Sequence, residues 1–283
     1  MSVQKCYDCP RRCGADRSIS KGFCGVGNSA VVAKIVDPFT FEEPCLGKLS
    51  AVFFGGCNLR CSYCQNFLIS RKAVGDEYSD SRLAAAFDNI TDGNALDLVT
   101  PTHFISVLER IFALTEKRRR VIYNTSGYET EEGVRRARSF TSVFLADFKY
   151  ADGEIARKYS GAADYPETAI KAIKAMREVK DVWEETDGAS VLKEGLVIRH
   201  LVLPGHVDDS IKVLDIIAAE LGTDTVISLM SQFTPNGVGD PNARLKRIEY
   251  KIVAEHAVKL GFKNGYIQRF ESADGKYTPD FGV

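Results

Sequence analysis

Three cysteines lie close together behind an apolar run, in the sequence FFGGCNLRCSYC at residues 53–64. They are Cys57, Cys61 and Cys64, which gives the spacing C-x3-C-x2-C. A 4Fe-4S cube normally takes four thiolate ligands, so a loop that offers three leaves one iron open to another ligand. Zinc is the alternative, but zinc sites usually close with ligands in two spaced pairs, and this loop has an unpaired third cysteine. The spacing therefore favours a 4Fe-4S cluster with one open iron.

A second group of cysteines lies near the amino terminus, at Cys6, Cys9, Cys13 and Cys24, in a stretch rich in glycine. This stretch has too few apolar residues to form a core of its own, so we interpret residues 1–30 as a metal-stabilised appendage. Tetrahedral zinc is our first expectation for the four thiolates, and a second 4Fe-4S cluster fits the same number of ligands. The remaining Cys45 is expected to be a buried, unreactive thiol.

The composition excludes some classes of protein. The chain has 283 residues, of which 45% are hydrophobic, and its 37 Lys and Arg against 38 Asp and Glu give a net charge of -1. It can form a substantial core, and no overall basic field indicates nucleic acid as an obligatory partner. The amino terminus lacks the apolar core of a secretion signal, and no apolar run could span a bilayer. We expect a soluble, cytoplasmic protein without a membrane partner, whose cysteines bind metal rather than form disulfides.

From residue 50 onward, short β-branched or aromatic runs alternate with longer amphipathic stretches, which predicts repeated βα units and a parallel sheet. Strands are expected near 50–55, 95–100, 119–124, 142–147, 195–203, 225–230 and 264–268. Helices are expected near 79–91, 102–117, 129–139, 152–160, 166–180, 208–221 and 242–261. An Asp-Gly turn signal predicts a surface hairpin around 181–188, and a lid or partner contact is the alternative there. Such an α/β chain forms a doubly wound sheet or an incomplete barrel, with its ligand at the carboxyl ends of the strands.

Polar residues follow several of these strands. The third strand is followed by Asn124 and Ser126, and the fourth ends in Asp147 and Lys149, which alternation sends to the same side. A plain turn and a surface salt bridge are the alternatives for these two pairs. Arg199 is a charge within an apolar strand, so it should face a pocket. These residues could together hold a polar ligand over the cluster.

The cysteine loop, with Tyr63 just before its last cysteine, resembles the cluster loop of radical S-adenosylmethionine enzymes. The resemblance implies that the methionine part of S-adenosylmethionine chelates the open iron. One electron from the cluster then splits this cofactor into methionine and a 5'-deoxyadenosyl radical, which takes a hydrogen atom from the substrate. It also implies a partial (β/α)6 barrel, here over residues 31–283, with flavodoxin or ferredoxin as the electron donor. No catalytic residue beyond the cofactor is assigned.

Further strings resemble a stand-alone relative of pyruvate formate-lyase activating enzyme. They are CYDCPRRC at 6–13, CQN at 64–66, LVTPTH at 98–103, YSG at 159–161 and MSQFTP at 230–235. The resemblance implies that Tyr63 helps to bind the adenine and that Asn124 and Ser126 hold a ribose or carboxylate. It places Asp147 and Lys149 at the cofactor and Arg199 on its carboxylate. A packed loop aromatic is the alternative for Tyr63.

The chain also departs from the activases. Their second strand ends in Gly-Gly-Glu, which holds the amino group of the cofactor, whereas this chain has Thr100, Thr102 and His103 there. We expect these residues to replace it; a helix cap beside a buried histidine is the alternative. The activity implied is activation of a glycyl radical enzyme, which would be a partner protein. The alternatives are a radical enzyme that modifies a peptide, an RNA or a small metabolite, and, more remotely, a non-catalytic metal-binding interaction protein.

Overall fold

The structure is a computed structural model, and it describes residues 5–40, 43–235, 243–270 and 281. A sheet with parallel neighbouring strands forms its centre. The strands are β2 (Leu49–Phe54), β4 (Ala95–Val99), β5 (Val121–Thr125), β6 (Val143–Asp147), β8 (Ala189–Leu201), β9 (Val226–Met230) and β10 (Gly265–Ile267). Each strand lies beside the one before it, in the order β2-β4-β5-β6-β8-β9-β10. A doubly wound sheet would reverse this order at a switch point, so the sheet is that of a partial barrel.

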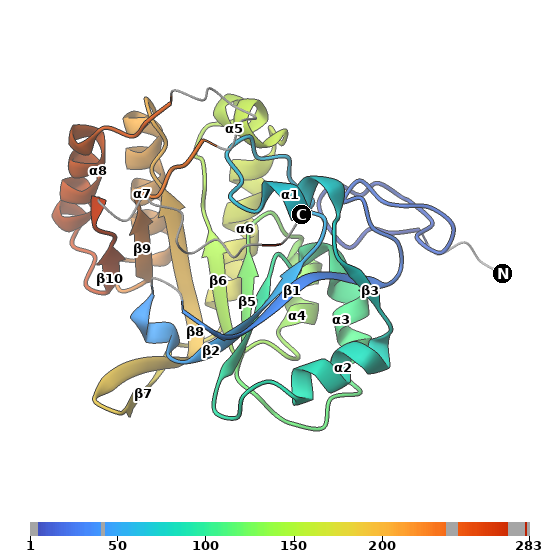
Figure 1. The fold of residues 1–283 in the computed structure, drawn as a ribbon. Coiled ribbons are helices and arrows are strands. Elements are labelled where there is room, and N and C mark those ends of the chain that lie inside the picture. Colours follow the sequence, from blue (N-terminus) through green and yellow to red (C-terminus); the bar gives the residue numbers. More distant parts are fainter. Residues whose placement is uncertain (1–4, 41–42, 236–242, 271–280, 282–283) are drawn as a thin grey trace.

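Helices cover the outer face of this sheet (Figure 1). They are α2 (Asp80–Asp88), α3 (Ile105–Phe112), α4 (Glu131–Ala137), α5 (Gly153–Ser160), α6 (Tyr165–Arg177), α7 (Val207–Leu221) and α8 (Arg247–Leu260). Neighbours pack in the order α2-α3-α4-α6-α7-α8. The short helices η1 (Pro44–Leu46) and η2 (Thr102–Phe104) precede β2 and α3, and α1 (Phe67–Lys72) follows the cysteine loop. Among the described residues, no helix has both the length and the apolar character that a membrane crossing requires.

Three strands lie outside the parallel set. The strand β1 (Ala30–Phe39) pairs antiparallel with β2 and with β3 (Asp76–Tyr78), and so extends the sheet beyond its first parallel strand. The strand β7 (Val182–Thr186) pairs antiparallel with β8 through a turn at Asp187 and Gly188. Both turn residues have positive φ, 53° and 77°, as a tight hairpin turn requires. The predicted hairpin is therefore confirmed.

Each predicted parallel strand is present, with its boundaries displaced by a few residues. Buried apolar runs such as β2 and β6 form these strands because both faces of a parallel sheet are covered. Each predicted helical range also contains a helix, although residue 242, where the last range begins, lies outside the described residues. The strand β1 starts next to the predicted boundary between appendage and barrel, and the division of the chain into these two domains stays a prediction. Cys45 is fully buried, as expected.

Candidate cofactor site

Strand alternation places polar side chains in the barrel interior, near the carboxyl ends of the strands. On β5, β6 and β8 the deeper inward positions are apolar, and a polar inward position follows two residues later. The apolar positions are Ile122, Leu145 and Val197, and the polar ones are Asn124, Asp147 and Arg199. The barrel floor is therefore apolar, and its polar layer lies at the carboxyl ends of the strands, where ligands bind in such folds.

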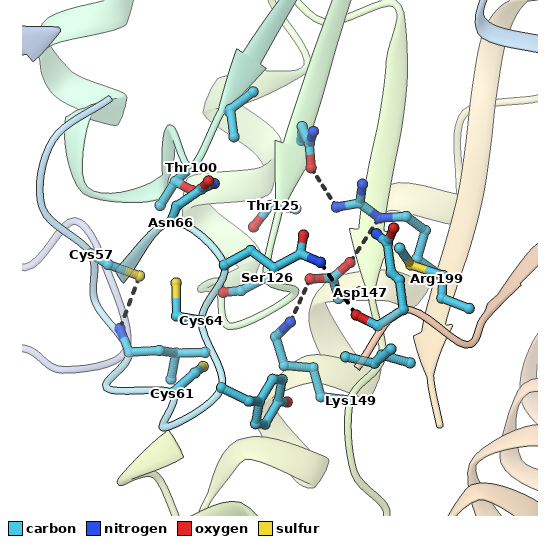
Figure 2. A pocket seen from close by; sticks show the side chains of 18 of the residues that line it. Cys57, Cys61, Cys64, Asn66, Thr100, Thr125, Ser126, Asp147, Lys149 and Arg199 are labelled. Carbon is cyan, nitrogen blue, oxygen red and sulfur yellow. Dashed lines mark hydrogen bonds and ion pairs between the residues drawn. The ribbon is translucent and has the colours of Figure 1, made fainter. Parts of the chain in front are cut away.

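A pocket opens over this polar layer (Figure 2). One side is formed by the loop after β2, which brings Cys57, Cys61 and Cys64, and the other by the ends of β4, β5, β6 and β8. The predicted residues that line it are Tyr63, Thr100, Asn124, Ser126, Asp147, Lys149 and Arg199. The structure thus brings together residues that are more than 130 positions apart in the sequence, as the strand-end prediction requires.

The three loop cysteines are free thiols held by nearby donors. The Leu59 backbone N–H donates to the sulfur of Cys57 at 3.3 Å, and the sulfur of Cys61 lies 3.0 Å from the hydroxyl of Ser160. Burial, together with the charges of Cys61 and Cys64, raises the pKa of Cys57 to about 12. Without a cation, the Cys57 thiol is therefore neutral, and bound iron would supply the positive charge that stabilises adjacent thiolates.

The chemistry of the donor set fits an iron-sulfur cluster. Cys57, Cys61 and Cys64 come from one loop and line the same pocket. A cube of four irons and four sulfides normally takes four thiolate ligands, so three thiolates leave one iron open to a ligand in the pocket.

Charged groups opposite the cysteines form one network. Asp147 accepts from Lys149 Nζ at 2.5 Å and from Arg199 Nε at 2.9 Å. Burial by itself would raise the pKa of Asp147, but the charges of Arg199 and Lys149 outweigh burial and hold this pKa below its ordinary value. The carboxylate is therefore ionised at neutral pH, and it fixes both cations in place.

Arg199 retains donors for a ligand. Its Nη2 donates to Asn124 Oδ1 at 2.6 Å, in addition to the Nε bond to Asp147. A guanidinium has five N–H donors, so these two bonds leave three, on a group that already lines the pocket. A planar fork of this kind matches a carboxylate. The network can thus orient a ligand carboxylate toward the cysteines.

Two small polar residues face the same space. The hydroxyl oxygen of Ser126 is buried and has no hydrogen-bond partner among the described residues, although Ser126 lines the pocket. Thr100 has φ 64° at the end of β4, and its N–H donates to Asn124 O at 2.9 Å. A β-branched residue rarely adopts this left-handed conformation, which tends to occur at functional sites. An unsatisfied hydroxyl beside a strained turn fits a polar ligand in the pocket.

Tyr63 lines the pocket from within an aromatic cluster. Its ring centroid lies 5.8 Å from that of Phe233 and 6.3 Å from that of Tyr159. Its hydroxyl lies 2.6 Å from that of Tyr150, and the residue is 7% exposed. The ring is therefore already packed, and the Tyr63 backbone and ring edge remain for contact with an adenine.

Thr102 and His103 are not in the pocket, contrary to the expectation that they replace Gly-Gly-Glu. Thr102 Oγ1 donates to the buried Glu129 at 2.6 Å, and His103 Nε2 donates to Gly55 O at 2.9 Å. Burial lowers the pKa of His103 to about 3, so its ring is neutral. The left-handed turn at Thr100 directs the chain away from the pocket, and η2 then packs both side chains behind β4. Of the three residues, Thr100 alone lines the pocket.

The sequence did not reveal every residue that lines the pocket. Glu43 is buried and accepts from Ser228 Oγ at 2.8 Å, although the two residues are 185 positions apart. No local pattern marks this contact. Gln232 also lines the pocket, and it belongs to the MSQFTP string that carried the resemblance, so a signal was present. The amino-terminal cysteines, Cys6, Cys9, Cys13 and Cys24, are free thiols outside this pocket.

A parallel partial barrel with three cysteines in the loop after its first parallel strand defines a class of iron-sulfur enzyme, and the comparison with protein families agrees. Residues 51–217 match the Radical SAM superfamily, which is more than half of the chain, so the chain belongs to that superfamily. Membership implies a 4Fe-4S cluster and cleavage of S-adenosylmethionine by a radical mechanism.

Comparisons with individual proteins find similarity along most of the chain. An uncharacterized protein of Methanocaldococcus jannaschii is 29% identical over 272 residues, which cover 90% of this chain and 75% of that protein. SuiB of Streptococcus suis is 11% identical, with a TM-score of 0.50 over 75% of this chain and 47% of SuiB. The structure of anSMEcpe with bound AdoMet and a peptide is 13% identical, with a TM-score of 0.49 over 77% of this chain and 61% of that protein. The chain thus spans less than two thirds of the length of these two solved structures.

Proposed function

We propose that this radical S-adenosylmethionine enzyme holds its cluster through Cys57, Cys61 and Cys64 and removes a hydrogen atom from a partner protein, as activating enzymes of glycyl radical enzymes do. One observation carries the assignment of the site. The pocket has three thiols on one side and the Asp147, Lys149 and Arg199 network on the other. The strings that resemble activating enzymes support the choice of substrate class.

The residues of the chain have distinct parts in this proposal. Arg199, oriented by Asp147 and Asn124, holds the carboxylate of the methionine part. Ser126 donates its unpaired hydroxyl to a ribose or carboxylate oxygen, and Thr100 faces the amino group. Tyr63 contacts the adenine. When bound, the cluster and S-adenosylmethionine supply a one-electron cleavage that yields a 5'-deoxyadenosyl radical.

The proposed cleavage consumes one electron, which a donor protein must supply to the cluster. We assign this part to flavodoxin or ferredoxin. The sheet of the described residues does not close into a ring: β10 forms one edge and β3 forms the other. In our proposal the substrate enters over the strand ends of this open sheet. An open barrel of this kind leaves room for a protein loop.

The first test is anaerobic cleavage of S-adenosylmethionine by the dithionite-reduced protein. We expect 5'-deoxyadenosine from the native chain and at least a hundredfold less from Cys61→Ala, which should also lose its iron. Cys45→Ala is the matched control, because Cys45 is buried away from the pocket and should retain iron and activity. A Cys61→Ala protein that keeps both its iron-sulfur absorbance and its activity would refute the site.

The second test concerns the substrate. Incubation with each glycyl radical enzyme of the host should yield a glycine-centred signal in electron paramagnetic resonance. The turn at Thr100, in place of Gly-Gly-Glu, supports a second candidate, an enzyme that modifies a peptide, an RNA or a metabolite. Absence of the glycine signal, together with 5'-deoxyadenosine formation stimulated by extracts without glycyl radical enzymes, would replace the first candidate by the second.

A further inference from the structure

The four amino-terminal cysteines gather in one small region. A Cβ at Gly22 would lie 3.3 Å from the sulfur of Cys24 and 3.5 Å from that of Cys13, so the absent side chain leaves room between them. Arg12 and Gly14, which flank Cys13, donate their N–H groups to Cys9 O at 3.0 Å and to Cys6 O at 3.1 Å, so backbone hydrogen bonds hold Cys13 beside Cys6 and Cys9. All four cysteines are free thiols. The chain thus brings a complete set of four thiolate ligands to one place.

The segment that carries these cysteines has little else to hold it together. Its described residues, 5–29, contain one isolated bridge, between Lys5 and Asp16, and neither a helix nor a strand. Apart from Cys9 and Cys24, Val26 is its buried apolar side chain. Such a segment keeps one conformation when a bound metal group fixes it.

The position of the group favours a cluster over zinc, which was our first expectation from the sequence. The group lies directly against the loop where the family implies a 4Fe-4S cluster, because the N–H of Cys57 donates to Cys24 O. Zinc does not exchange electrons, whereas an iron-sulfur cluster at this place could exchange them with its neighbour. Four thiolates leave no open iron, so such a cluster transfers electrons rather than binds a substrate.

The two cysteine groups touch through their backbones. The N–H of Cys57 donates to Cys24 O at 3.3 Å, and a Cβ at Gly56 would lie 2.5 Å from the same oxygen. Arg60, within the cysteine loop, places its guanidinium 4.2 Å from the ring centroid of Phe23 and donates to Phe23 O. A proposed ligand of one group is thus hydrogen-bonded to a proposed ligand of the other, so the two sites are neighbours.

The amino-terminal group also has an inner and an outer side. Cys24 is buried against the cysteine loop, whereas Cys13 is exposed. Exposed cations lie near these cysteines in the sequence: Lys5 directly precedes Cys6, Arg12 directly precedes Cys13, and Lys21 is three residues before Cys24. Cations around the outer side attract acidic proteins and accelerate their association.

We propose that Cys6, Cys9, Cys13 and Cys24 hold a second 4Fe-4S cluster, which relays single electrons from an acidic carrier protein to the cluster at Cys57, Cys61 and Cys64. The carrier is oxidised as the second cluster is reduced, and the second cluster is reoxidised as the first accepts the electron. The relay, although not the metal site, depends on the function proposed above.

Metal content tests the site separately from any activity. The native chain should bind about eight irons, and the Cys57→Ala/Cys61→Ala/Cys64→Ala variant should keep about four and show a reduced-cluster signal in electron paramagnetic resonance. In the native chain the two reduced clusters should broaden each other's signals. About four irons and one zinc in the native chain would overturn the proposal, even if the triple variant failed to fold. Loss of S-adenosylmethionine cleavage with eight irons retained would instead count against the proposed function.

Reduction kinetics test the relay. With reduced flavodoxin as donor, Arg12→Glu/Lys21→Glu should reduce the first cluster at least tenfold more slowly, whereas dithionite should reduce it at the native rate. The matched control is Lys259→Glu/Lys263→Glu, two exposed lysines at the end of α8, on the opposite side of the molecule from the amino-terminal segment (Figure 1). Equal slowing in both double variants, or in neither, would refute entry of electrons through the amino-terminal group.

Discussion

Thr100 combines a β-branched side chain with φ 64° at the mouth of the pocket. This conformation costs a non-glycine residue about 1–3 kcal/mol. The same turn directs Thr102 and His103 behind the sheet, so its strain is part of how the pocket is built. At the scale of single residues, backbone conformation thus decides which side chains reach the cofactor.

We expect Thr100→Gly to raise the free energy of unfolding by about 1 kcal/mol, because relief of the strain exceeds the entropy that glycine adds to the unfolded chain. The affinity for S-adenosylmethionine should fall, since the hydroxyl is lost. Urea unfolding and equilibrium dialysis measure the two effects. Thr186→Gly, on the exposed β7 with extended backbone, is the control and should lose stability. Equal losses in both variants would show that Thr100 is not strained.

Glu129 predicts a dependence of stability on pH. Burial raises its pKa from 4.5 to about 7, although Thr102 and Thr125 donate to its Oε1 at 2.6 Å each. As the pH rises, the Glu129 carboxyl loses its proton near pH 4.5 in the unfolded chain and near pH 7 in the folded chain. Between these values the folded state binds more protons, so the free energy of unfolding falls as the pH rises. Glu129→Gln should remove this loss, which is on the order of 3 kcal/mol.

Urea unfolding at pH 5 and at pH 8 measures this effect. At each pH, the free energy of unfolding of the variant is subtracted from that of the native chain. This subtraction cancels the contribution of other buried carboxyls, such as Asp97, whose pKa is also raised to about 7 by burial. Glu131→Gln, on an exposed neighbour, should leave the dependence unchanged. A Glu129→Gln protein with the native pH profile would show that Glu129 does not titrate in this range.

At the scale of elements, the cysteine loop packs so closely against the amino-terminal segment that position 56 has no room for a side chain. Gly56, with φ 82°, lies against Cys24 O, whereas Gly93, with φ 84°, has no atom within 4 Å of its Cβ position. The same alanine substitution therefore carries similar backbone strain at both positions but a clash at Gly56 alone.

Gly56→Ala should lose about 1–3 kcal/mol more stability than Gly93→Ala, since overpacking adds to the shared strain. It should also make the amino-terminal segment more sensitive to proteolysis. Urea unfolding and limited proteolysis of both variants check the prediction. Identical behaviour of the two variants would mean that the segment does not dock as the structure shows.

The elements also show what sequence reasoning can reach. Buried parallel strands such as β5 and β6 were predictable because both of their faces are apolar, and their polar ends because alternation fixes which residues share a side. The strand β1 was not predicted: it contains Pro38, and no side chain of its second half is fully buried. Thr102 and His103 were misplaced because the φ of Thr100 cannot be read from a local pattern. Glu43 was missed because its partner Ser228 comes from the far end of the barrel.

At the scale of the whole molecule, a few arginines fasten the amino-terminal segment to the barrel. Arg17 is 9% exposed and donates to Gly27 O at 2.7 Å and to His103 O at 2.6 Å. Arg11 donates to Asn58 O at 2.7 Å and also to Gly161 O at 2.8 Å. The segment is thus joined to the cysteine loop and to two turns of the barrel mainly by polar contacts.

Arg17→Met should lower the free energy of unfolding by about 2–4 kcal/mol, because it leaves buried carbonyl oxygens without donors. It should also lower the iron content, since the segment would separate from the cysteine loop. Thermal unfolding and iron analysis measure both effects. Arg135→Met, which removes an exposed ion pair with Glu132, should change stability by less than about 0.5 kcal/mol. An equally mild effect of Arg17→Met would remove Arg17 from this role.

The backbone hydrogen bond between Cys57 N–H and Cys24 O also has a consequence for the order of events during synthesis. Cys24 leaves the ribosome 33 residues before the loop on which it docks, a wait of about 2–7 s at elongation rates of roughly 5–20 residues per second. The parallel strands on which that loop rests are completed later still. The first four cysteines are therefore the first to be exposed to solvent and the last to be covered by the barrel. We expect the nascent chain to recruit iron or a metal-delivering factor at its amino terminus before the barrel has closed over the pocket.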